Sequence, residues 1–122
     1  MKYTSKAMAT EYINGVFTEK YNNEAFRWAL LMAGIESVGD ASLKQYARSD
    51  DPKFFVLGQI SYFFIAYVFQ LALRDNKLGV VNTYWNGMTN IGNTFIGMAM
   101  GETYTLYQLS GILLVTAGIL MI

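Results

Sequence analysis

The chain has 122 residues, no net charge at pH 7, and neither cysteine nor histidine. Without these residue types, disulfides, thiol chemistry, Cys/His metal sites and imidazole-dependent catalysis are excluded. The zero net charge argues against nucleic acid as a partner. Charged residues make up only 15% of the chain, well below the ~25% of ordinary soluble domains. The composition therefore favours a membrane protein.

Three long stretches contain no charged residue: residues 54–73, 78–100 and 104–122. Each is about as long as the ~20 residues that a helix needs to cross a bilayer. A fourth helix, roughly from Glu24 or Arg27 to Ala47, precedes them and begins with an apolar run. The alternative, a soluble bundle of buried helices, would need more polar chain around it than this sequence has. We predict an all-α, multi-pass integral membrane protein with four transmembrane helices, surrounded by lipid. The distribution of lysine and arginine modestly favours cytoplasmic termini, and a dual topology is the alternative.

Residues 1–26 form a separate polar segment. Its apolar side chains recur at helical spacing, and Ser5 or Thr10 is suited to cap a short helix. An amphipathic segment beside a first span lies along the bilayer interface, and a disordered tail is the alternative. We therefore divide the chain into an interfacial extension, residues 1–26, and a transmembrane domain, residues 27–122.

The first span carries Glu36, and Asp40 and Lys44 follow at intervals of four residues. This spacing places the three side chains on one helical face. A carboxylate at membrane mid-depth costs at least ~2.5 kcal/mol, and desolvation disfavours its charged form. Glu36 is therefore suited to bind a proton or a cation in turn, which is the minimum requirement for exchange. The alternative is a structural carboxyl.

Asp40 allows two interpretations. It can titrate with Glu36 as a coupled pair, or it can form an ion pair with Lys44 in the favourable acid-first order. We expect the Asp40–Lys44 ion pair, because it leaves Glu36 as the group that binds protons.

Side chains on the second and third spans are candidates for the same site. Trp85 lies in mid-helix, away from both interfaces, and its ring can stack on a cation, although such a ring more simply packs in a core. Tyr62 lies halfway along the second span and can hydrogen-bond Glu36. Asparagines recur every three or four residues of the third span and form a polar stripe that needs a partner or water: Asn82, Asn86, Asn90 and Asn93.

The fourth span contains Gly111 and Gly118, seven residues apart on one face. Small residues let membrane helices approach closely. This face can pack within one chain or between two chains, and we expect a homodimer.

In their order along the chain, these features resemble the small multidrug resistance family, four-helix exporters within the drug/metabolite transporter superfamily. The resemblance covers residues 26–122 and rests on GIESVGDASLK around Glu36, Tyr62, Gly79, the WNG run at 85–87, Gly101–Glu102 and the Gly111-to-Gly118 segment. It implies an antiparallel homodimer in which two copies of Glu36 face one cavity lined by Trp85. It also implies alternating access, with Gly87 near a bend in the third span and the fourth span holding the dimer.

The sequence departs from the family pattern at several positions. Asn82 stands where the family usually has tyrosine, Asp40 where a small neutral residue is usual, and Thr89 where a second glycine is usual. The extension 1–26 is foreign to the family. A cavity rich in asparagine suits a small polar cation, such as a guanidinium or a polyamine, better than a bulky aromatic one.

We therefore predict a proton-coupled exporter of small organic cations, without cofactor or metal. An enzyme is not expected, because Glu36 and Asp40 point along one face and not across a substrate. The alternative is a scaffold that joins a larger membrane-associated assembly through residues 1–26. The expected proton and substrate site consists of Glu36, Tyr62, Asn82, Trp85 and Asn86.

Overall fold

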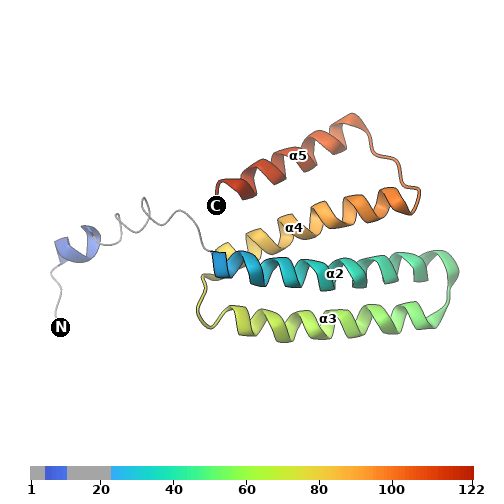
Figure 1. Ribbon diagram of the computed structural model, residues 1–122, viewed down its shortest axis with the longest axis horizontal. Helices are drawn as coiled ribbons and strands as arrows, with labels where there is room; N and C mark the ends of the chain where they lie inside the picture. Colours follow the sequence, from blue (N-terminus) through green and yellow to red (C-terminus); the bar gives the residue numbers. More distant parts are fainter. Residues whose placement is uncertain (1–4, 11–22) are drawn as a thin grey trace.

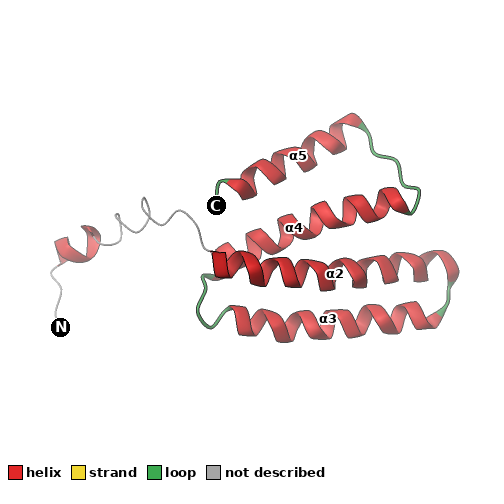
Figure 2. Ribbon diagram, viewed as in Figure 1, coloured by secondary structure: helices red, strands yellow, loops and turns green. Residues whose placement is uncertain are grey.

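A computed structural model describes residues 5–10 and 23–122, and all the regular structure in these residues is helical (Figure 2). Four long helices follow one another: α2 (Asn23–Ser49), α3 (Pro52–Ala72), α4 (Leu78–Ala99) and α5 (Leu106–Leu120). The prediction of an all-α fold is confirmed.

Residues 5–10 form a short, exposed helical segment. The Thr10 hydroxyl donates to the Lys6 carbonyl at 2.9 Å, so Thr10 lies inside this segment and does not cap its start. Residues 1–4 and 11–22 of the predicted interfacial extension lie outside the described residues, and its residues 23–26 belong to the first long helix.

The helix boundaries have local causes. Asp50 has a φ of 56° and ends α2. α3 begins at Pro52, where a missing N–H does no harm, and the Asp51 side chain accepts from the Lys53 N–H. Thr105 and Gln108 form a capping box at the start of α5. This cap delays α5 relative to the predicted stretch, and the helix is 15 residues long.

α2 is the central helix and packs against both α3 and α4 (Figure 1). Glycines permit the close approach of α3. A β-carbon at Gly58 would lie 2.7 Å from Leu43 Cδ2, and one at Gly39 would lie 2.9 Å from Ser61 Cβ. The core is built from small and medium apolar side chains: Ala25, Ala29, Met32, Val68, Ala72, Val81, Tyr84 and Ile119.

α5 lies against α4 near the C-terminus of the chain and leans away from it towards the connecting loop (Figure 1). The close contact is at Gly87, where the Ile119 side chain occupies the space that a β-carbon would need. The two helices therefore form a wedge that opens at the loop end.

Within the described residues, α3 is the one helix that is both long and apolar enough to cross a membrane. α5 is apolar but shorter than the ~20 residues of a span. α2 carries charges along its length, and α4 carries the asparagines. The four predicted helices are thus present, whereas length and composition support one span and not four.

Large apolar side chains are exposed on the outer faces of α3 and α5. Phe63 is 74% exposed, Leu114 is 74% exposed and Tyr107 is 92% exposed. Extended apolar surfaces of this kind mark contact with a membrane or a partner. Within residues 5–10 and 23–122 nothing covers these two helix faces, so they are candidates for such contact.

Candidate functional site

Glu36 is half-buried on α2 and faces α4. Its Oε2 accepts a hydrogen bond of 2.9 Å from the hydroxyl of Thr89. Thr89 is itself buried, so the bond lies between the two helices. Neither of the two ion pairs found in the described residues involves Glu36. Its carboxylate therefore has a polar partner but no cationic one.

Asp40 lies one turn further along α2 and joins three helices. Its Oδ1 accepts a hydrogen bond from the hydroxyl of Tyr62 on α3. Its Oδ2 accepts one of 2.6 Å from the Asn93 amide on α4. Both carboxylate oxygens therefore accept a hydrogen bond. From the sequence, Glu36 was a candidate partner for Tyr62, but the Tyr62 hydroxyl donates to Asp40 instead.

The expected ion pair between Asp40 and Lys44 is not formed. Lys44 Nζ instead lies 3.0 Å from Glu102 Oε1 in the loop between α4 and α5. A pair four residues apart on a helix is worth only about 0.2–0.5 kcal/mol. Asp40 instead accepts hydrogen bonds from α3 and α4, and Lys44 pairs with Glu102 in the α4–α5 loop. These contacts together outweigh the local pairing.

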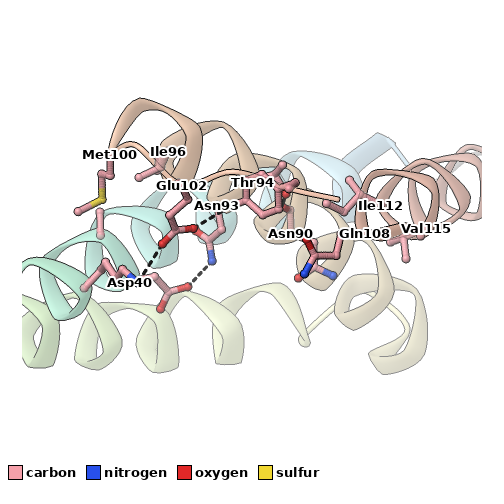
Figure 3. A pocket seen from close by; sticks show the side chains of 15 residues that line it. Asp40, Asn90, Asn93, Thr94, Ile96, Met100, Glu102, Gln108, Ile112 and Val115 are labelled. Atoms are coloured by element: carbon pink, nitrogen blue, oxygen red, sulfur yellow. Dashed lines mark hydrogen bonds and ion pairs between the residues drawn. The ribbon is translucent and has the colours of Figure 1, made fainter. Parts of the chain in front are cut away.

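A cavity of about 640 Å³ fills the wedge between α4 and α5, and α2 forms its floor. Figure 3 shows Asp40 and Asn93 joined beside Glu102, with Gln108, Ile112 and Val115 along α5. Glu36, Trp85, Tyr62, Asn82 and Asn86 do not line it. The cavity of the single chain is therefore built around Asp40, one turn away from the predicted centre at Glu36.

The other predicted site residues lie apart from this cavity. Trp85 is half-buried and packs against Phe69, with ring centroids 5.1 Å apart. Its Nε1 is buried and has no hydrogen-bond partner in the described part of the chain. Asn82 and Asn86 are exposed on α4. The asparagine stripe is therefore divided, because only Asn93 turns inwards to a carboxylate.

The glycines differ in their surroundings. The Ile119 side chain occupies the space beside Gly87, so the missing side chain of Gly87 allows α4 and α5 to pack within the chain. A β-carbon at Gly111 or Gly118 would meet no atom within 4 Å. Among the described residues the Gly111–Gly118 face is therefore open, and Gly111 also lines the cavity.

Four residues that the sequence analysis did not select take part in these contacts: Thr89, Asn93, Glu102 and Tyr104. Asn93 belonged to the asparagine stripe, and Thr89 was noted only as a departure from the family pattern. No sequence signal pointed to Tyr104, whose hydroxyl donates to Glu102 Oε2 at 2.9 Å.

Within residues 5–10 and 23–122, no group of three acidic side chains could hold a metal ion. Comparisons of the chain with protein-family models, with curated proteins and with solved structures gave no match.

Proposed function

We propose that this chain is a membrane exporter that exchanges protons for small organic cations, and that Glu36 is the side chain for which the two compete. The observation that carries this proposal is the environment of Glu36. The carboxyl is half-buried between α2 and α4, and in the described part of the chain a single neutral donor, Thr89, is bonded to it. The nearest lysine on its own helix face, Lys44, is held by Glu102.

This arrangement leaves room for the exchange chemistry. A proton or a cation that reaches Glu36 has no lysine to displace. A proton and a cation would compete for the same carboxylate oxygens, so the loss of one leaves these oxygens open to the other. The hydroxyl of Thr89 can serve both states, since it donates to the carboxylate and can accept from the protonated acid.

The exposed faces support the membrane and dimer parts of the proposal. The apolar faces of α3 and α5 would be covered by lipid. Asn82 and Asn86 are exposed polar groups on an uncharged helix, which a second, antiparallel copy would cover. The open Gly111–Gly118 face would let α5 of that copy approach closely.

The test is cation-induced proton release. The purified protein in detergent and weak buffer is mixed with guanidinium, methylammonium or 1,4-diaminobutane, and a pH indicator reports released protons. We expect release with at least one of these cations and its loss in Glu36→Gln. The matched control is Glu24→Gln, because Glu24 is an exposed acid on the same helix, and it should release protons as the parent does.

Two outcomes would contradict the proposal. One is proton-linked binding that persists in Glu36→Gln. The other is the absence of proton release with all three cations in protein that keeps its helical content by circular dichroism.

A further inference from the structure

The cavity between α4 and α5 is separate from Glu36, and the side chains that line it indicate which kind of ligand would fit. Its volume of about 640 Å³ falls within the roughly 300–1,000 Å³ of pockets that hold small molecules. Glu36 does not contribute to its wall. The exchange proposed at Glu36 therefore does not explain this space.

The charge of the lining favours a cation. Three side chains with a formal charge at neutral pH line the cavity: Asp40, Lys44 and Glu102. Lys44 and Glu102 neutralise each other in the 3.0 Å ion pair. In the described residues Asp40 is bonded only to the neutral donors Tyr62 and Asn93. Arg48, the other cation at this end, donates to the Met100 carbonyl, so Asp40 has no cationic partner of its own.

The polar atoms near Asp40 favour a cation that carries N–H groups. An ionised carboxylate has about four lone-pair sites, and Asp40 uses one on each oxygen. Asn93 Oδ1 is buried and has no partner in the described residues, and leaving such an acceptor unsatisfied is costly. The Asn90 amide also lines the cavity. A quaternary ammonium could satisfy none of these acceptors.

Apolar side chains form much of the remaining lining. They are Ile112 and Val115 of α5, Ile96 of α4, and Met100 just after α4. A ligand with its ammonium or guanidinium group at Asp40 would therefore place its apolar part against α5.

We propose that this cavity is a second binding site, for a monovalent cation with N–H donors on a short apolar body, and that Asp40 is its counter-charge. The site does not depend on exchange at Glu36. An ammonium group there donates to Asp40 and to Asn93 Oδ1, and the α5 wall covers the body of the ligand.

The test uses isothermal titration calorimetry of the full chain in detergent with three probes of similar size. The probes are 2-phenylethylammonium, phenyltrimethylammonium and 2-phenylethanol. We expect the first to bind most tightly, because the second lacks N–H donors and the third lacks charge. Asp40→Asn should weaken the binding of 2-phenylethylammonium roughly tenfold or more, because a charged hydrogen bond is lost.

Asp40 also joins three helices, so a second pair of variants keeps the test valid if Asp40→Asn unfolds. Ile112→Trp fills the cavity from α5 and should abolish binding of 2-phenylethylammonium. Leu113→Trp is the matched control, because Leu113 is the next residue, is 69% exposed and does not line the cavity. It should bind as the parent does.

Glu36→Gln separates this site from the exchange site, and it should still bind 2-phenylethylammonium. The proposal is overturned if Glu36→Gln abolishes binding, if Ile112→Trp leaves it unchanged, or if phenyltrimethylammonium binds as tightly as 2-phenylethylammonium. None of these results bears on whether protons are released at Glu36.

Discussion

Lys44 on α2 and Glu102 in the loop between α4 and α5 form an ion pair, with Lys44 Nζ 3.0 Å from Glu102 Oε1. Tyr104 donates to the other oxygen of Glu102, and Arg48 donates to the Met100 carbonyl at 3.0 Å. These contacts attach the loop to the end of α2. They close the wide end of the wedge, beside the cavity.

The first prediction concerns acid. The hydrogen bond from Lys44, and then that from Tyr104, lower the pKa of Glu102 below its ordinary 4.5. Since the folded pKa is below the unfolded one, the stabilisation is present above pH 4.5 and is lost as the pH falls through the lowered pKa. Thermal unfolding midpoints between pH 7 and about pH 3 should fall on the acid side, and Glu102→Gln should flatten part of this decline. A parallel decline in both proteins would show that Glu102 is not coupled to folding.

The second prediction concerns alkali. The hydrogen bond to Glu102 raises the pKa of the Tyr104 hydroxyl above 10.0. This contribution to stability is complete below pH 10 and is lost as the pH rises through the raised pKa. Ultraviolet absorbance reports the ionisation of tyrosine as the pH rises. The difference between the titration curves of the parent and of Tyr104→Phe isolates Tyr104, and its midpoint should lie above pH 10. In Glu102→Gln the same difference curve should move to lower pH, and an unmoved curve would exclude Glu102 as the cause.

The third prediction concerns the contact between Gly87 and Ile119. Gly87→Ala should destabilise the chain by about 1–3 kcal/mol through overpacking, offset in part by the ~1 kcal/mol advantage of alanine in a helix. Gly79→Ala is the matched control, because a β-carbon there meets no atom within 4 Å. Chemical denaturation in detergent measures both. In an Ile119→Ala background, Gly87→Ala should lose its cost, and an unchanged cost would contradict the contact.

The fourth prediction concerns the bond between Tyr62 and Asp40. Tyr62→Phe removes the hydroxyl and leaves one Asp40 oxygen without its donor. Because Tyr62 is itself 39% exposed, water replaces part of this bond, and we expect a loss of about 0.5–1.5 kcal/mol. Tyr67→Phe makes the same change on the same helix at a residue that is 58% exposed, and it should cost less than about 0.5 kcal/mol. Denaturation midpoints of the two variants give the comparison. Equal costs would mean that the Tyr62 hydroxyl does not hold α3 to α2.

The helices were predictable because their causes are local. Charge-free stretches, polar turns and Pro52 are visible in the sequence, and α3 and α4 begin and end within two residues of the predicted limits. α5 also begins and ends two residues inside the predicted stretch 104–122, and the capping box of Thr105 and Gln108 sets its start.

The partners of the acidic side chains were not predictable, because they come from other helices. The spacing correctly placed Glu36, Asp40 and Lys44 on one face of α2. The spacing could not show that Thr89 bonds Glu36. Nor could it show that Tyr62 and Asn93 bond Asp40, or that Glu102 pairs with Lys44.

The sequence by itself determined that the chain is helical, where its helices run, and that one helix presents two acids and a lysine to its neighbours. Only the tertiary structure decided which charge stays uncompensated and where a cavity opens. The physical reason is that helix propensity and hydropathy act over a few neighbouring residues. The choice among hydrogen-bond partners depends on how α3, α4 and the α4–α5 loop approach α2 in space.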